Sequence, residues 1–199
     1  MVINARSLAK VDALPALSAE LKYSNVDICI VSETWLNNTI LNHLICPNGY
    51  TIIRKDRGER IGGEVAIFCR HDWQLFELRS AFYNTFECLW GKVQTPNSVY
   101  HIAALYNPPD TNQQTSLDLI NHLMDSCELL QSADPNAKII IGGDIIQLDI
   151  RPLLNQLSLK QMVKSPTRGQ RILDVFITNA PHLWTKISIQ NSLVRSDHA

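Results

Sequence analysis

Residues 138–144 (KIIIGGD) decide the fold class. Three consecutive isoleucines predict a strand buried on both faces, because a strand with one solvent-facing side alternates apolar and polar residues. The run ends in Asp144, which places a carboxylate at the end of the strand. The same design recurs at residues 26–31 (VDICIV), which lead into Glu33, and at residues 172–177 (ILDVFI), which contain an aspartate. The sequence therefore predicts several buried strands that deliver acidic side chains.

Helices and further strands surround these segments. Amphipathic helices are predicted at residues 8–23 and at about 114–130, where apolar residues recur every three to four positions. Five β-branched or alternating segments between them predict consecutive strands, at residues 50–54, 65–70, 75–79, 86–93 and 99–106. The chain closes through residues 184–189 and 193–198. We expect one domain over residues 1–199, an α/β sandwich of four layers in which two packed β-sheets are flanked by helices.

Length and composition exclude several classes of protein. A chain of 199 residues that is 45% apolar can bury one or two layers of core. Its apolar runs fall short of the roughly 18 to 20 residues of a membrane span, and the first ten residues lack the apolar region of a signal peptide. We therefore expect an intracellular, non-secreted protein without a membrane partner. Five scattered cysteines without a C-x-x-C pair are interpreted as buried free thiols.

The net charge of −1 argues against a protein that wraps duplex DNA, because such domains usually carry a basic surplus. A nuclease that contacts DNA briefly needs less positive charge. Two local basic clusters are present, at residues 54–60 and at Lys164, Arg168 and Arg171. Solvated loops are the simplest interpretation of both clusters.

Carboxylate or imidazole groups fall at four segment ends, namely at Glu33, Asp144, Asp174 and the Asp197-His198 pair. Each is a weak signal when taken alone, because acidic residues at strand ends commonly serve turns. Together they are more informative, since open α/β sheets bind ligands beyond the carboxyl ends of their strands. Mg²⁺ is usually held by one or two carboxylates with water and substrate phosphate, and Glu33 suits that role.

Eight short motifs resemble, in order and spacing, those of the endonucleases of LINE-type (non-LTR) retrotransposons, Jockey-like elements in particular. They span nearly the whole chain, at residues 4–8 (NARSL), 32–36 (SETWL), 54–57 (RKDR) with 62–67 (GGEVAI), 106–109 (YNPP), 143–144 (GD), 166–169 (PTRG), 172–174 (ILD) and 196–198 (SDH). These enzymes belong to the endonuclease/exonuclease/phosphatase superfamily. The resemblance implies a metal-dependent phosphodiesterase that nicks one DNA strand and leaves a 3′ hydroxyl for target-primed reverse transcription. It also implies two partners, DNA and a reverse transcriptase domain of the full-length chain, and a nuclear location.

The resemblance further implies roles for matching residues. Glu33 would bind Mg²⁺, or alternatively Mn²⁺, with Asn4 in support. Tyr106 would hydrogen-bond the scissile phosphate or its surroundings, since a phenol both donates and accepts. Asp144 would orient and deprotonate the attacking water.

Other roles carried over in the same way belong to the second half of the chain. Asp197 would hold His198, whose second ring nitrogen would donate to the phosphate as negative charge develops there. Asp174 would stabilise the leaving 3′ oxygen. The DNA contacts implied by the resemblance are Thr167, Arg168 and Ser196.

The sequence departs from the family pattern at residues 143–146, which read Gly-Asp-Ile-Ile where the family has Gly-Asp-Phe-Asn. Ile146 therefore replaces an amide that can donate and accept hydrogen bonds. Loss of one preorganised donor of this kind typically costs roughly 10²- to 10³-fold in rate. We expect impaired activity, and two alternatives stay open: a relic that folds without cutting, and a phosphatase-like phosphoesterase on the same fold.

Two smaller departures concern a turn and the chain ends. Glu64 stands where relatives usually have a third glycine, which predicts a strained turn or an extra charge beside the DNA face. The chain begins just before Asn4 and stops one residue after His198. We therefore expect a terminal strand of the family fold to be missing, as in a fragment of a longer polyprotein.

Overall fold

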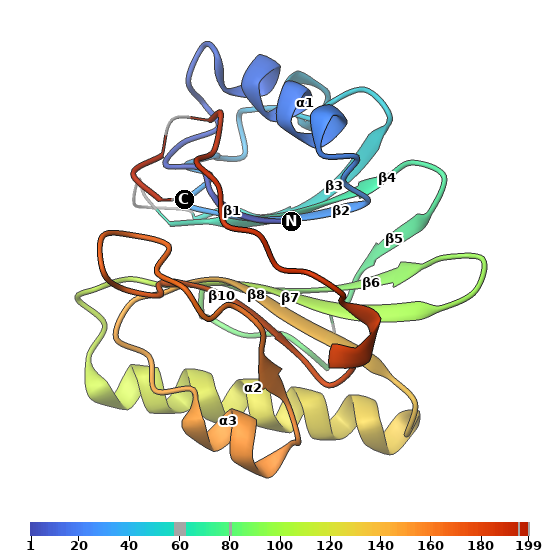
Figure 1. Cartoon of the computed structure of the whole chain (residues 1–199), viewed down its shortest axis with the longest axis vertical. Helices are drawn as coiled ribbons and strands as arrows, with labels where there is room; N and C mark the ends of the chain where they lie inside the picture. Colours follow the sequence, from blue (N-terminus) through green and yellow to red (C-terminus); the bar gives the residue numbers. More distant parts are fainter. Residues whose placement is uncertain (58–62, 80, 195, 199) are drawn as a thin grey trace.

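The computed structural model describes residues 1–57, 63–79, 81–194 and 196–198. Two β-sheets face each other, and helices cover their outer faces (Figure 1). Helix α1 (Ala13–Tyr23) lies on one side, and α2 (Gln113–Ala133) and α3 (Arg151–Gln156) lie on the other. Two single turns of 3₁₀ helix, η1 (Asn42–Leu44) and η2 (Pro181–Leu183), lie in connecting segments. The predicted α/β sandwich with two packed sheets and outer helices is confirmed.

The first sheet is formed, within the described residues, by four strands. In spatial order they are β1 (Val2–Asn4), β2 (Ile28–Ser32), β4 (Val65–Arg70) and β3 (Tyr50–Lys55). β1 runs parallel to β2 and places Asn4 beside Ser32, whereas the other neighbours are antiparallel. Asn4, the last residue of β1, therefore lies beside Ser32, the last residue of β2, and Glu33 follows Ser32 directly.

The second sheet contains six strands in the described part of the chain. In spatial order they are β5 (Gln74–Glu77), β6 (Cys88–Gln94), β7 (Val99–Asn107), β8 (Lys138–Ile145), β10 (Asp174–Thr178) and β9 (Lys160–Gln161). β8 is parallel to β7 and antiparallel to β10. This register sets Asp144 between Tyr106 and Asp174 on neighbouring strands.

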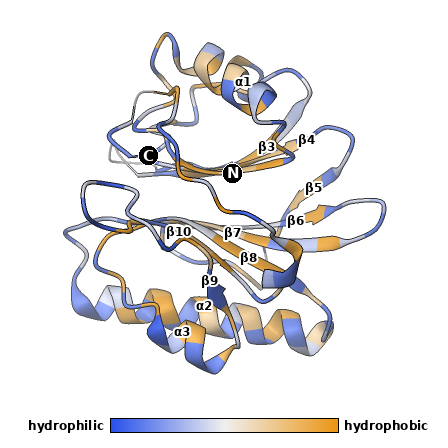
Figure 2. Ribbon diagram, in the orientation of Figure 1, coloured by the Kyte–Doolittle hydropathy of each residue, from blue (hydrophilic) through white to orange (hydrophobic). Residues whose placement is uncertain are grey.

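The isoleucine run of β8 is buried on both faces, as its sequence predicts. Ile139 and Ile141 belong to the core beneath α2 and α3, and Ile140 belongs to the core between the two sheets. A third core lies between the first sheet and α1. Apolar residues follow the strands of both sheets in Figure 2. The strand that carries Asp144 is therefore fixed by packing on each side.

The N-terminal helix is shorter than its apolar pattern predicts. α1 begins at Ala13 rather than Leu8, and Val11 is 95% exposed, so it does not share the buried helical face. Leu8 is buried without being helical, because its backbone N–H donates to the carbonyl oxygen of Thr34 (2.7 Å). Tertiary bonds to the segment after β2 replace the first helical turn. β1, α3 and β9 were not predicted.

The cysteines are free thiols; four are buried, and Cys46 is partly buried. None of the helices in the described residues combines the length and apolarity needed to cross a membrane.

Glu64 occupies a buried left-handed turn directly before β4. The backbone φ of Glu64 is 58°, and the residue is 1% exposed. Its backbone N–H donates to Glu87 Oε2 (2.7 Å), and within the described residues its own Oε2 has no hydrogen-bond partner. Burial, and to a smaller extent the charge of Glu87, raise the pKa of Glu64 to about 7. A strained turn is therefore present, but Glu64 is not an exposed charge. Gly62 and residues 58–60 of the neighbouring motifs lie outside the described residues.

We expect Glu64→Gln to stabilise the protein at pH 8 and to have little effect near pH 4. The folded-state pKa is raised to about 7 from 4.5. As the pH rises between these values, the unfolded chain releases the proton before the folded chain does, so stability falls. A shift of this size corresponds to a penalty of about 3 kcal/mol above pH 7.

Urea unfolding at both pH values checks this expectation, with the exposed Glu128→Gln as the matched control. Glu64→Gly should add about 1 kcal/mol at pH 4 by relieving the left-handed backbone, and more than Glu64→Gln at pH 8, where it also removes the carboxyl. Equal effects of Glu64→Gln at pH 4 and pH 8 would show that the carboxyl is not the source of the penalty.

Candidate active site

The side-chain amide of Asn4 joins the two carboxylates at the ends of β2 and β8. Asn4 Nδ2 donates to Glu33 Oε1 and to Asp144 Oδ2, both at 2.8 Å. Arg6 donates its backbone N–H to Asn4 Oδ1 (3.0 Å), which fixes the amide orientation because only the oxygen can accept. Asn4 is 2% exposed, so these bonds are shielded from water. The structure thus brings Asn4, Glu33 and Asp144 together, as the sequence predicts.

Backbone constraints place Glu33 and Asp144. Glu33 has a φ of 52°, and its carbonyl oxygen accepts the backbone N–H of Ser7 (2.8 Å). Gly143 has a φ of 139°, and a Cβ there would lie 1.8 Å from the carbonyl oxygen of Leu105. Glycine is therefore required for β8 to approach β7 at this point. The residue that follows this close approach is Asp144.

His198 is held by Asp174. His198 Nδ1 lies 2.8 Å from Asp174 Oδ2, and both residues are at least 95% buried. Its Nε2 lies 3.5 Å from Asn4 Nδ2 and 3.8 Å from Asp144 Oδ2. Burial by itself lowers the pKa of His198, but the hydrogen bond to Asp174 and the charges of Asp174 and Asp144 raise it overall. The imidazole is therefore oriented at Nδ1, with Nε2 turned toward the carboxylate of Asp144.

The expected pairing of Asp197 with His198 is corrected by the structure. Asp197 Oδ1 lies 3.4 Å from Arg6 Nη1, and its Oδ2 lies 2.5 Å from Arg168 Nη2. The chain bends at Asp197, so this side chain and that of His198 need not face the same partner. Asp197 points to the arginines, while His198 points inward to Asp174. Asp174 is thus the partner of the imidazole, a role not assigned to it from the sequence.

Thr167 and Ser196 use their hydroxyl groups to position other residues. Thr167 is 4% exposed, and its Oγ1 accepts the backbone N–H groups of Leu173 and Asp174, both at 3.0 Å. Ser196 Oγ accepts the backbone N–H of His198 (3.2 Å). The expected DNA contact is therefore not available to the side chain of Thr167 in this conformation. Both hydroxyls hold the Asp174–His198 pair instead.

Tyr106 lies beside Asp144 and is 9% exposed. Burial raises the pKa of its phenol, and the charges of Glu33 and Asp144 raise it further. The phenol therefore keeps its proton at neutral pH and can donate a hydrogen bond. Its backbone N–H donates to the carbonyl oxygen of Glu87 (2.9 Å), which anchors this end of β7.

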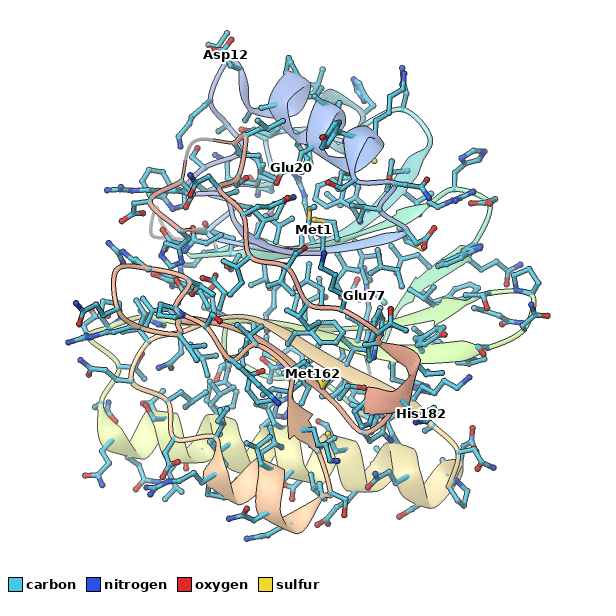
Figure 3. All side chains as sticks on the ribbon, viewed as in Figure 1. Met1, Asp12, Glu20, Glu77, Met162 and His182 are labelled. Atoms are coloured by element: carbon cyan, nitrogen blue, oxygen red, sulfur yellow. The ribbon has the colours of Figure 1, made fainter. Side chains whose placement is uncertain are left out.

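Two residues of the site region were not identified from the sequence. Glu20 of α1 is 4% exposed, and its Oε2 accepts Ser192 Oγ (2.8 Å) and the backbone N–H of Leu193 (3.0 Å). Glu20 lies between α1 and the C-terminal segment in Figure 3, so it tethers the segment that carries His198. A carboxylate on the buried face of a predicted helix was the available signal.

The second residue is Asn107, which follows Tyr106 within the YNPP motif. It is 2% exposed, and its Nδ2 donates to the carbonyl oxygen of Ile146 (2.7 Å). Ile146 itself is half-buried and directly follows β8. The substitution at position 146 therefore lies in the turn that Asn107 braces, two residues beyond Asp144.

The oxygen ligands of the site suit a hard divalent cation. Asp144 Oδ1 and Asp174 Oδ1 are buried and have no hydrogen-bond partner among the described residues, and unpartnered oxygens of this kind call for a polar ligand. Glu33 supplies a third carboxylate, linked to Asp144 through Asn4. No cage of three or more His, Cys, Asp or Glu side chains occurs in the described ranges. Mg²⁺ is usually held by one or two carboxylates with water and phosphate, and carboxylate oxygens are the ligands that this site offers.

No protein-family profile and no curated protein matches the sequence. Solved structures do match in three dimensions. The endonuclease domain of TRAS1, a telomere-specific non-LTR retrotransposon, has a TM-score of 0.74 and 16% identity, over 99% of this chain and 93% of that one. The AP endonuclease LMAP from Leishmania major has a TM-score of 0.70 and 14% identity, over 90% and 78% of the two chains.

A third similar structure is an endonuclease/exonuclease/phosphatase family protein from Bacteroides thetaiotaomicron. Its TM-score is 0.63 and its identity 15%, over 89% of this chain and 79% of that one. At such identities the likeness concerns the fold. This chain has the endonuclease/exonuclease/phosphatase fold, which it shares with the TRAS1 endonuclease domain.

Proposed function

We propose that this protein is a divalent-metal-dependent phosphodiesterase that nicks DNA, as the endonuclease domain of a non-LTR retrotransposon. The proposal rests on the Asn4 amide, which joins Glu33 and Asp144 beside the Asp174–His198 pair. The fold shared with the TRAS1 endonuclease domain supports DNA as the substrate. A full-length chain would carry a reverse transcriptase domain that uses the nicked strand, and the protein would act in the nucleus.

Each residue of the site has a chemical task in this proposal. Asn4 holds Asp144 by Oδ2, which leaves Oδ1 to accept a proton from the attacking water. Burial and the charge of Asp174 raise the pKa of Asp144, which makes it a stronger base near neutral pH. Asp174 orients His198, so a proton on Nε2 can be donated to a phosphate oxygen that gains charge. Glu33 would hold Mg²⁺ or Mn²⁺, which supplies Lewis-acid stabilisation of the phosphate when bound.

The second candidate function is a protein that binds DNA without cutting it. Ile146 favours it, because a hydrocarbon side chain replaces an amide in the turn directly after β8. A phosphatase-like activity is the third candidate, since the shared fold does not choose the substrate.

We expect Ile146→Asn to nick supercoiled plasmid with Mg²⁺ roughly 10²- to 10³-fold faster than the native chain, because it restores one preorganised polar group. Glu33→Ala in either background should abolish nicking. Agarose gels that separate supercoiled from relaxed plasmid provide the readout, and circular dichroism verifies that each variant is folded.

The possible outcomes separate the candidates. Nicking by the revertant alone would mean that Ile146 silenced an assembled site, whereas equal, Glu33-dependent nicking by both chains would refute the weight given to Ile146. Silence from both with retained DNA binding would favour the non-cutting protein. Hydrolysis of a small phosphomonoester without plasmid nicking would favour the phosphatase.

Asp174→Asn and Asp197→Asn form a matched pair that tests the partner of His198. We expect Asp174→Asn to reduce the nicking rate by roughly 10⁴-fold, as does loss of the carboxylate that orients the histidine of serine proteases. Asp197→Asn should change the rate by less than about tenfold, because exposed ion pairs contribute little. Single-turnover nicking in the faster of the native and Ile146→Asn backgrounds measures both. The larger loss in Asp197→Asn would restore the pairing expected from the sequence.

A further inference from the structure

Two arginines from distant parts of the chain meet on one exposed carboxylate at the rim of the site. Arg6 precedes α1, Arg168 lies between β9 and β10, and Asp197 bridges them. Each oxygen of Asp197 faces a different guanidinium, at 3.4 Å and 2.5 Å. The side chains of Arg6, Arg168 and Asp197 are 54%, 43% and 37% exposed, so a large ligand can reach all three.

The backbone of Arg6 is rigidly built onto the candidate active site. Arg6 and Ser7 have φ angles of 44° and 95°, a conformation that costs energy in residues other than glycine. Three backbone N–H groups hold this loop: Arg6 donates to Asn4 Oδ1, Ser7 to the carbonyl of Glu33, and Leu8 to the carbonyl of Thr34. The backbone from which the Arg6 side chain projects is thereby held at a fixed offset from Asn4 and Glu33.

Arg168 is attached to the other side of the site in the same manner. Its backbone N–H and carbonyl both bond to Arg171, which closes a tight turn (3.1 and 3.0 Å). The preceding residue, Thr167, is buried and accepts the backbone N–H of Asp174. Both arginines thus stand within two residues of a group that bonds directly to the site.

These ion pairs contribute little to the stability of the fold, so stability does not account for the arrangement. Exposed ion pairs contribute about 0 to 1 kcal/mol. Polynucleotide affinity, by contrast, comes mainly from cations that contact phosphates. The chain has a net charge of −1 and no general basic surplus, so any phosphate affinity must come from local sets of cations. Arginine suits this task, because its planar guanidinium matches the geometry of phosphate oxygens.

We propose that Arg6 and Arg168 form a clamp for a backbone phosphate that flanks the scissile one, and that Asp197 occupies the place of this phosphate until DNA binds. The inference rests on the proposed function, because it requires a polynucleotide substrate. Asp197 and a phosphodiester each carry one negative charge and two acceptor oxygens. Exchange of one for the other preserves the charge balance of the clamp.

The test measures DNA affinity in the Glu33→Ala background by fluorescence anisotropy of a labelled duplex, over a range of salt concentrations. Arg6→Gln and Arg168→Gln should each weaken binding roughly tenfold and reduce the slope of log K against log salt by about 1. Asp197→Asn should tighten binding several-fold, because the competing carboxylate is removed. The controls are Arg151→Gln and Asp149→Asn, an exposed ion pair at α3 that should leave affinity unchanged.

Unchanged affinity and salt slope in Arg6→Gln, or weaker binding by Asp197→Asn, would overturn the clamp. In either case Arg6, Arg168 and Asp197 would form only two surface ion pairs, and the proposed function would stand as long as the Glu33→Ala parent binds DNA. Absence of binding by the parent at low salt would instead refute DNA as the substrate, and the clamp with it.

Discussion

The candidate site depends on one amide group. The side-chain amide of Asn4 has two N–H bonds. It donates them to Glu33 and Asp144, which lie at the ends of β2 and β8, strands of different sheets. Without this group two carboxylate oxygens would face each other without a donor, and each buried unsatisfied polar group costs about 1 to 3 kcal/mol. The parallel pairing of β1 with β2 places Asn4 there, and Arg6 prevents the amide from turning over. The packing between the sheets and the chemistry at their edge are thus joined in a single side chain.

Strained backbone gathers around the same amide. Ser7, Glu33, Trp35 and Glu64 all have φ between 52° and 95°, and all lie in the segments that follow β1 and β2 or precede β4. Such conformations cost of order 1 to 3 kcal/mol each and persist only where the surrounding structure enforces them. Here the enforcing contacts are backbone bonds between these segments, such as Ser7 to Glu33 and Thr34 to Glu64. The two cores that flank the first sheet supply the stability that offsets this strain.

The sequence predicted well which residues are buried. It predicted less well which partner a given residue faces. Three isoleucines predicted a strand buried on both sides, and the motif residues Asn4, Glu33, Asp144 and His198 do converge. The predicted start of α1 was wrong, because the apolar spacing from Leu8 onward does not reveal that the backbone of Leu8 bonds to the segment after β2. The predicted partner of His198 was wrong for a related reason. Adjacency in sequence suggested Asp197, but the chain bends there and this side chain faces Arg6 and Arg168 instead.

The different partners of Asp197 and His198 also separate two tasks along the C-terminal segment. His198 is fixed from inside by Asp174 and Ser196, and further upstream Glu20 holds Ser192 and Leu193. None of these bonds involves Asp197, which faces outward to its arginines. A phosphate could therefore displace Asp197 without breaking a bond that orients the imidazole. The site can remain assembled while Asp197 is replaced by a phosphate. The contacts that hold His198 come from Asp174 and Ser196, whereas the guanidinium groups of the two arginines pair with Asp197.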